Sequence, residues 1–224
     1  MANKIGIEFV CTGNGGRSPT AHTIASNYVE NLGLEKRIGI YSSGTGADLA
    51  EEDLFQFPIP FLLDYIEVGL RSGTYQGSLK TTAERVVAQK ETFALEIEKG
   101  DREARRIVEY CIRYLMADEV VKRNQVLLEI GLVPENRFHR QTEVRDDVNL
   151  VLAMKQSNAD YVRKLYQGRT EVPEIATLCE YAGMGGQVDD PFGGTLDDFR
   201  KTRNVIGEAV QKSIDRAVEE YKGV

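Results

Sequence analysis

The segment KIGIEFVCTGNGGRSPT, residues 4–20, contains the features that decide the fold. Its first part, KIGIEFV, is rich in β-branched and aromatic side chains, and this pattern predicts a strand that ends at Cys11. The stretch TGNGG follows, and its glycines free the backbone for turns and for positive φ angles. Ser18 as N-cap and Pro19 at the first helical position then predict a helix that ends at Gly33.

Further strands and helices follow the same order along the chain. Residues 37–43, RIGIYSS, predict a second strand, so the first part of the chain forms a βαβ unit with a parallel sheet and a right-handed crossover. Residues 148–154, VNLVLAM, form a continuous apolar run that is typical of a strand buried on both faces, and a helix is expected from about Ser157. Residues 174–178 predict a fourth strand, and residues 195–221 predict a long closing helix.

The middle of the chain has a different pattern. Residues from about 50 to 136 show no clear strand alternation, and their apolar side chains recur at helical spacing. The motif Thr81-x-x-Glu84 indicates a capping box at the start of one helix, and Asp101 starts another. A further apolar set at residues 120–130 predicts one more helix. We therefore expect residues 50–118 to be a helical insertion in an α/β core.

Composition and charge exclude several classes of protein. Hydrophobic residues make up 42% and charged residues 28% of the 224, which argues against a disordered chain and predicts a single domain, residues 1–224. A net charge of −7 provides no basic field for a nucleic-acid partner. Three cysteines and two histidines predict reduced thiols in a cytoplasmic protein rather than a disulfide framework or a zinc site. No apolar run approaches the roughly 20 residues of a membrane helix, and no signal-peptide layout is present, so no membrane partner is expected.

The spacing Cys11-x5-Arg17 indicates a site for an oxyanion. A glycine-rich turn between a strand and a helix aligns backbone N–H groups, and the helix dipole adds positive charge at the same place. We expect this setting to lower the pKa of Cys11 and to make its thiolate a nucleophile. The guanidinium of Arg17 suits two oxygens of a phosphate, and Ser18 can donate a hydrogen bond to the sulfur. Without this context, a buried structural role would be the ordinary interpretation of Cys11.

The segment DDPFGG provides a candidate acid and base. Hydrolysis through a cysteinyl-phosphate needs a proton for the departing oxygen and then a base for the attacking water. Asp190 lies beyond the last predicted strand, and Pro191 would fix the loop that presents its carboxylate. The structural alternative is that Asp190 caps the last helix.

These segments together resemble the low-molecular-weight protein tyrosine phosphatase family. VCTGNGGRSPTA resembles the family signature V-C-x-G-N-x-x-R-S-P, and Ser42-Ser43-Gly44-Thr45 resembles its S-A-G-T. The segments LVLAMKQSN and DDPFGG resemble the family's late strand with its helix and the family's Asp-Pro loop. The resemblance covers residues 4–46 and 138–224.

The resemblance implies a four-stranded parallel sheet flanked by helices, in a three-layer sandwich. It implies that Cys11 is the nucleophile, Arg17 the phosphate clamp and Asp190 the general acid and base, and that neither a metal nor a cofactor is needed. It also implies that Asn14 holds the loop in an unusual backbone state through a hydrogen bond to Ser42. The phosphate loop would then consist of Thr12, Gly13, Asn14, Gly15, Gly16, Arg17 and Ser18.

The chain departs from the family pattern at positions that influence substrate specificity in the family. Gly16 replaces a cysteine that is frequent before the arginine, and Gly15 lacks the side chain that helps to choose between phosphotyrosine and phosphoarginine. The chain also has no tryptophan, which often forms a wall of the substrate cleft in the family. Aromatic residues of the predicted insertion could form a substitute wall: Phe55, Phe57, Phe61, Tyr65 and Tyr75.

We therefore expect a phosphatase that hydrolyses phosphomonoesters, foremost protein phosphotyrosine, with phosphoarginine or a small phosphomonoester open as substrates. One alternative is an arsenate reductase on the same fold, in which Cys179 is the second thiol and Cys111 would have to leave an apolar helical stripe. The other is a non-catalytic phosphate-binding module whose insertion blocks the cleft. The oligomeric state stays open.

Overall fold

The computed structural model describes residues 4–134 and 140–221, and its centre is a four-stranded parallel sheet. The strand order is β2-β1-β3-β4. The strands are β1 (Ile5–Cys11), β2 (Ile38–Gly44), β3 (Leu150–Ala153) and β4 (Glu174–Thr177). This arrangement confirms the predicted fold class and the four predicted strands, with ends that differ by one or two residues.

Strand β1 lies in the interior of the sheet and ends at the candidate nucleophile. It pairs in parallel with β2 on one side, where Cys11 is opposite Gly44, and with β3 on the other, where Val10 is opposite Ala153. Every residue of β1 is buried, because helices cover both faces of the sheet. Cys11 is thus held at the carboxyl edge of the sheet, where ligands of parallel α/β folds bind.

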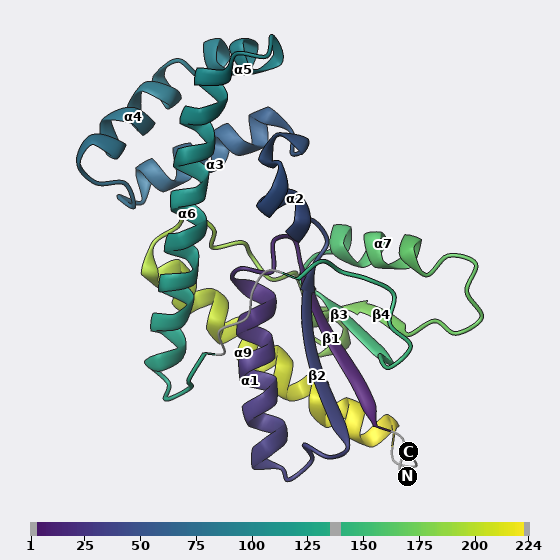
Figure 1. The fold of residues 1–224 in the computed structure, drawn as a ribbon. Helices are drawn as coiled ribbons and strands as arrows, with labels where there is room; N and C mark the ends of the chain where they lie inside the picture. The colour runs from purple at the N-terminus through teal and green to yellow at the C-terminus, as the bar shows by residue number, and fades with distance from the viewer. Residues whose placement is uncertain (1–3, 135–139, 222–224) are drawn as a thin grey trace.

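Helices cover the two faces unequally (Figure 1). Helices α1 (Arg17–Asn31) and α9 (Leu196–Glu220) pack side by side against one face, together with Leu150 and Leu152 of β3. Helix α7 (Gln156–Leu165) covers the other face, where it packs on Val151. A short helix, α8 (Leu178–Tyr181), follows β4. The alternation of side chains along β3 therefore separates two layers of helices, as the sandwich requires.

Between β2 and β3, the chain is mostly helical from Ala47 to Leu128. Beyond the carboxyl edge of the sheet, the helices form a second hydrophobic cluster, which includes Leu63, Ile66, Val108 and Leu115 (Figure 1). The elements of this region are α2 (Ala47–Glu52), the 3-10 helix η1 (Leu54–Gln56), α3 (Ile59–Arg71), α4 (Gly77–Ala88), α5 (Lys90–Glu98) and α6 (Arg102–Leu128).

Helix α6 corrects part of the sequence prediction. It runs without a break from Arg102, capped by Asp101 as expected, to Leu128, so the separate helix predicted at residues 120–130 does not exist. No glycine or proline interrupts this stretch, and nothing in it favours a break. The predicted end of the insertion at residue 118 therefore lies inside one continuous helix that connects the second cluster to the sheet layer (Figure 1).

Two predicted helix starts are also wrong. Helix α1 begins at Arg17 with Gly16 as N-cap, so Ser18 is already helical and its hydroxyl is free for other contacts. Helix α4 begins at Gly77, so Thr81 lies in its interior and no capping box forms there. The N-caps are Gly16 and Gln76, and neither helix start has a side-chain cap.

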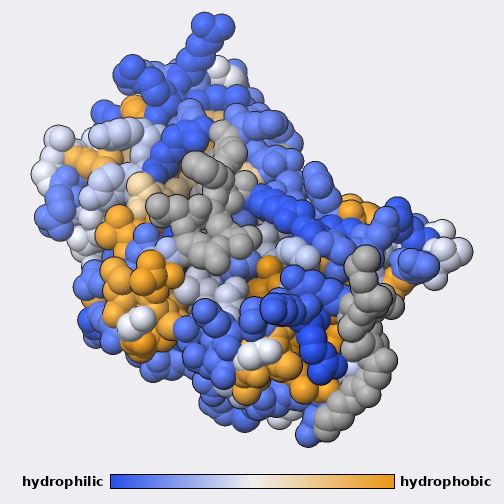
Figure 2. Space-filling model, turned by 60° about the horizontal axis from the view of Figure 1, so that its bottom comes forward, coloured by the Kyte–Doolittle hydropathy of each residue, from blue (hydrophilic) through white to orange (hydrophobic). Residues whose placement is uncertain are grey.

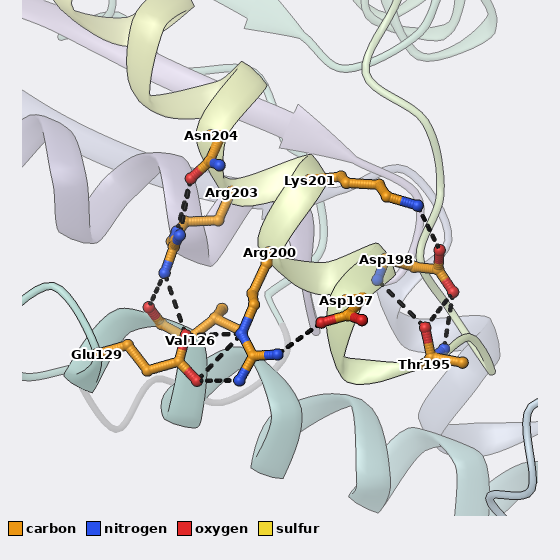
Figure 3. A network of polar contacts seen from close by, with 9 residues as sticks. All are labelled: Val126, Glu129, Thr195, Asp197, Asp198, Arg200, Lys201, Arg203 and Asn204. Atoms are coloured by element: carbon orange, nitrogen blue, oxygen red, sulfur yellow. Dashed lines mark hydrogen bonds and ion pairs between the residues drawn. The ribbon is translucent and has the colours of Figure 1, made fainter.

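Ion pairs fix the end of α6 to the start of α9 (Figure 3). Arg200 donates to both carboxylate oxygens of Glu129, from Nη2 at 2.7 Å and from Nε at 3.0 Å. Arg203 donates from Nη1 to the carbonyl oxygen of Val126 at 2.7 Å. Thr195 and Asp198 form the capping box that starts α9. Because both helices are held here, the preceding turns of α6 have a defined position beside the loop that follows β1.

The surface seen in Figure 2 is mostly hydrophilic, with hydrophobic residues in separate patches. Exposed apolar side chains near the end of α6 include Leu128, Ile130 and Val133. Among the described residues, no helix combines the length and the apolar character needed to cross a membrane.

Candidate functional site

The loop between β1 and α1 has the strained conformation expected for it. Asn14 has a φ of 54°, and it is the one non-glycine residue with a positive φ among the described residues. Its backbone N–H donates to Sγ of Cys11 at 3.2 Å, and its Nδ2 donates to Oγ of Ser18 at 2.9 Å. The backbone N–H of Arg140 donates to its Oδ1 at 3.1 Å. These contacts stabilise a conformation that curls the loop around the sulfur.

The hydrogen bond expected between Asn14 and Ser42 is not present. The Oγ atom of Ser42 is buried and has no hydrogen-bond partner among the described residues. Ser42 lies opposite Phe9 inside the sheet, two residues before β2 ends, while the Asn14 side chain is fully engaged by Ser18 and Arg140. Ser18 therefore takes the supporting position that the sequence assigned to Ser42.

The hydroxyl of Ser18 connects the sulfur to the backbone of β2. Its Oγ lies 3.0 Å from Sγ of Cys11 and 3.0 Å from the carbonyl oxygen of Ser43. A hydroxyl has one proton, so Ser18 can donate only one hydrogen bond. When Cys11 is a thiol, the thiol donates to Ser18 and Ser18 donates to Ser43. When Cys11 is a thiolate, Ser18 can donate to its sulfur instead. Ser18 can thus form a hydrogen bond with Cys11 in both protonation states without a shift of its oxygen atom.

The pKa of Cys11 is raised, contrary to the expectation from sequence. Complete burial of the sulfur is the largest influence and raises the pKa, while the charge of Arg17 and the hydrogen bonds with Ser18 lower it. The sequence revealed the groups that stabilise the thiolate. It did not reveal how completely the end of β1 is removed from water.

Arg17 and Asp190 form an ion pair within the site. Nη2 of Arg17 lies 2.5 Å from Oδ2 of Asp190, and its Nη1 donates to the carbonyl oxygen of Val188 at 3.3 Å. The hydroxyl of Tyr65 donates to the same Oδ2 at 3.3 Å. Asp190 does not cap the last helix, because α9 begins later and is capped by Thr195. The two functional residues predicted from distant motifs thus meet beside Cys11.

A cavity lies over the loop, and aromatic rings form much of its wall. The Tyr65 ring stands edge-on to Phe61 and to Phe192, with ring centroids 4.5 Å and 4.7 Å away. The residues that line the cavity are Cys11, Thr12, Gly13, Gly15, Arg17, Leu54, Phe57, Phe61, Leu62, Tyr65, Ile112, Met116, Glu119, Asp190 and Phe192. Three of the five aromatic residues predicted from the insertion therefore line this cavity.

Phe55 and Tyr75 are the two exceptions. Tyr75 is buried in the second hydrophobic cluster, where its hydroxyl donates to the carbonyl oxygen of Cys111 at 3.3 Å. Phe55 packs instead under the guanidinium of Arg105, 4.7 Å from the ring centroid. Spacing along the chain could not separate these side chains from those that reach the cavity.

Helix α6 adds two charged residues that the sequence interpretation missed. Glu119 is buried and lines the cavity. Arg123, one turn later, is also buried, and its Nη1 donates to the carbonyl oxygen of Gly15 at 2.8 Å. A Glu and an Arg at this spacing usually form a solvated pair on a helix surface, so the sequence contained no signal that they touch the loop.

Burial determines the charge state of Glu119. Burial and the charge of Asp190 raise its pKa to about 8, although Arg17 and Arg123 lower it. The backbone at Gly16 approaches this carboxyl group so closely that a Cβ atom there would lie 2.2 Å from Oε1 of Glu119. Glycine at position 16 is therefore what allows Glu119 to reach the loop.

The remaining thiols lie outside the cavity lining. Cys111 is buried in the second hydrophobic cluster, and burial raises its pKa to about 11. Cys179 is buried in the core between the sheet and α9. Within residues 4–134 and 140–221, no group of three or more His, Cys, Asp or Glu side chains is arranged to hold a metal ion.

Comparison with known proteins decides the family. The sequence model described as low molecular weight phosphotyrosine protein phosphatase matches residues 6–54 and 116–222, which together exceed half of the chain. The chain belongs to this family. The unmatched stretch, residues 55–115, begins at η1 and ends inside α6.

Curated proteins that are similar in sequence to this chain belong to the same family. Low molecular weight protein-tyrosine-phosphatase PtpB from two strains of Staphylococcus epidermidis is 36% identical over 66 residues, which cover 30% of this chain and 45% of the relative. The matched stretch thus spans less than half of these curated relatives.

Solved structures of the family show the same fold. A YwlE mutant from Bacillus subtilis is 21% identical with a TM-score of 0.55, and the alignment covers 96% of this chain and 99% of that one. The low molecular weight protein tyrosine phosphatase from T. tengcongensis is 21% identical with a TM-score of 0.57, at 95% and 99% coverage. A protein tyrosine phosphatase from Entamoeba histolytica is 15% identical with a TM-score of 0.58, at 97% and 99% coverage.

Proposed function

We propose that this protein hydrolyses phosphomonoesters, foremost protein phosphotyrosine, through a cysteinyl-phosphate intermediate. The observation that carries the proposal is that Cys11 and Arg17, at the two ends of one loop, and Asp190, from a distant segment, line one cavity. Membership of a phosphatase family supports the reaction class, and phosphorylated molecules are the substrates that such a family implies.

In the first step, the thiol proton of Cys11 passes to an oxygen of the bound phosphate and the thiolate Sγ attacks the phosphorus, so that an S–P bond forms and the ester P–O bond breaks. Protonated Asp190 donates its proton to the departing oxygen. In the second step, Asp190 takes a proton from water, the water oxygen forms a bond to phosphorus, and the S–P bond breaks to release phosphate. Ser18, 3.0 Å from the sulfur, stabilises the thiolate that leaves.

The ion pair between Arg17 and Asp190 fits this cycle. A phosphoryl group bound to the guanidinium replaces Asp190 as its partner, and the released carboxylate can then take up the proton that it gives to the departing oxygen. The hydroxyl of Tyr65 stays within 3.3 Å of Oδ2 and keeps the carboxyl group oriented toward the cavity. The binding of phosphate to Arg17 is thereby coupled to the release of the Asp190 carboxyl group from the same guanidinium.

The walls of the cavity favour an aromatic phosphate ester. Phe57, Phe61, Tyr65 and Phe192 surround the entry to the loop with ring faces and edges, against which a phenyl ring packs well. A guanidinium or a short aliphatic group buries less apolar area against these rings. Three of these residues belong to residues 50–118, and we propose that this segment is an insertion in a single domain and that it replaces the missing tryptophan wall.

The two alternatives have less support. An arsenate reductase needs a second thiol that reaches Cys11, and of the three cysteines only Cys11 lines the cavity. For a blocked phosphate-binding module, the insertion would have to close the cavity over Cys11, yet Cys11 is among its lining residues.

Turnover of p-nitrophenyl phosphate and of peptides that carry phosphotyrosine, phosphoserine or phosphoarginine tests the proposal. The wild type should release phosphate fastest from the phosphotyrosine peptide. Cys11→Ser should abolish turnover and still bind inorganic phosphate, because the serine hydroxyl is a far weaker nucleophile. Cys179→Ser is the matched control and should keep full activity. Full activity of Cys11→Ser would contradict the mechanism, and loss of arsenate reduction in Cys179→Ser would favour the reductase.

A further inference from the structure

Helix α6 places a second carboxyl group beside the oxyanion loop. Glu119 lines the same cavity as Cys11, Arg17 and Asp190, and it approaches the loop at Gly16, where no side chain intervenes. Arg123, one turn further along α6, anchors this face of the helix to the carbonyl oxygen of Gly15 at 2.8 Å. The anchor at Arg123 therefore holds this face of α6, with Glu119, close to the loop.

Charged and titratable groups face Glu119 from each element around it. They are Arg17 of α1, Asp190 of the loop before α9, Asp118 and Arg123 of α6, Tyr65 of α3, and Cys11 at the end of β1. Both arginines have other partners, since Arg17 binds Asp190 and Arg123 binds the loop backbone. Glu119 is thus a buried carboxyl group whose negative charge is only partly compensated, and its pKa is about 8.

A dianion in this cavity changes what Glu119 can contribute. An ionised carboxylate repels the anion, whereas a protonated carboxyl group has an O–H that donates to an anion oxygen. Because burial weakens the screening by water, the difference between the two states is large at this position.

We propose that Glu119 is a further residue of the oxyanion site, which binds the tetrahedral anion with the Glu119 carboxyl group protonated and donating to one of its oxygens. The inference rests on the proposed function, since it assigns the anion to the loop around Cys11. It adds a proton-dependent contact that no residue of the loop itself supplies. A phosphate ester would then bind only to the form of the enzyme that carries a proton on Glu119.

Sulfate is a suitable probe, because it stays a tetrahedral dianion across the pH range of interest. The binding protein is the Cys11→Ser variant, in which the thiol no longer titrates and no turnover occurs. If only the protonated form of Glu119 binds, the sulfate Kd should rise about tenfold between pH 7 and pH 9, because the competent fraction falls with a pKa of about 8. Calorimetry in buffers of different ionisation enthalpy should show uptake of about half a proton per sulfate at pH 8.

The comparison protein is Cys11→Ser with Glu119→Gln, whose amide also donates but does not titrate. Its sulfate affinity should stay level from pH 7 to pH 9, with no proton uptake. Glu103→Gln in the same background is the matched control, since it removes an exposed charge from the same helix and should keep the full pH dependence. Asp190→Asn should move the midpoint below pH 8, because the charge of Asp190 raises the pKa of Glu119.

The inference is overturned if Cys11→Ser shows neither pH-dependent affinity nor proton uptake, or if Glu119→Gln keeps the same dependence. Proton uptake is measured without altering Glu119, so it decides the question even if the glutamine variant does not fold. Failure of the proposed function has a different signature, namely no turnover of any phosphate ester by the wild type while sulfate binding keeps its pH dependence.

Discussion

The Oδ2 atom of Asp190 lies 2.5 Å from Nη2 of Arg17, so the proposed acid and the proposed phosphate clamp form an ion pair beside Cys11. Arg17 begins α1, and Asp190 precedes α9, the helix that packs beside α1. The packing of these two helices on one face of the sheet therefore brings the pair together.

Asp190→Asn should slow hydrolysis according to the leaving group. An amide cannot protonate the departing oxygen, so turnover of phenyl phosphate should fall by about 10²- to 10⁴-fold. The fall should be smaller for p-nitrophenyl phosphate, whose leaving group needs little protonation. Measured kcat values for both esters check this, with Asp189→Asn at the exposed neighbouring position as control. Equal losses for the two esters would exclude Asp190 as the acid.

Gly44→Ala should destabilise the protein and displace the oxyanion loop. A Cβ atom at Gly44 would lie 2.5 Å from the carbonyl oxygen of Thr12 and 2.7 Å from the backbone nitrogen of Asn14, and backbone atoms cannot yield as a side chain does. We expect a loss of about 1–3 kcal/mol or more in the free energy of unfolding. Urea titration measures this, and Gly185→Ala, with no atom within 4 Å of its Cβ, should be nearly neutral.

Arg123→Met should loosen the loop at Gly15. The variant removes the donor to the Gly15 carbonyl oxygen and leaves Glu119 with one cation fewer, so its pKa should rise further. The expected cost is about 1–3 kcal/mol in the free energy of unfolding, together with weaker phosphate binding. Arg106→Met changes an exposed arginine of the same helix and should leave both quantities unchanged. Equal effects of the two variants would assign Arg123 to general helix stability.

Glu119→Gln should stabilise the protein at alkaline pH. The folded pKa of Glu119 is about 8 and its ordinary value is 4.5, so between these values the folded state binds more protons than the unfolded state. The wild type should therefore lose stability relative to Glu119→Gln as the pH rises from about 5 to 8, by an amount on the order of a few kcal/mol. Urea titrations at pH 5, 7 and 9 measure the difference. A constant difference across this range would show that Glu119 does not titrate there.

Much of the site was predictable because its parts are contiguous in the chain. A strand, a glycine-rich loop and a helix N-terminus in direct succession place Cys11, Asn14 and Arg17 around one point, since each position follows from the preceding few dihedral angles. Asp190 was predictable because it follows the last strand of a parallel sheet, whose carboxyl ends all meet at one edge.

The sequence by itself therefore determined the four-stranded sheet, the loop around Cys11 and the residues of the proposed chemistry, because local patterns decide them. Only the tertiary structure decided that Glu119 and Arg123 reach this loop, that Ser18 replaces Ser42 beside Asn14, and that burial raises the pKa of Cys11. The first and the third depend on which face of a distant helix is buried and on how completely water is excluded, and both are results of packing between segments far apart in the chain, about a hundred residues for Arg123 and Gly15. The second depends on how the loop folds back on itself, so that Asn14 meets Ser18 only four residues later.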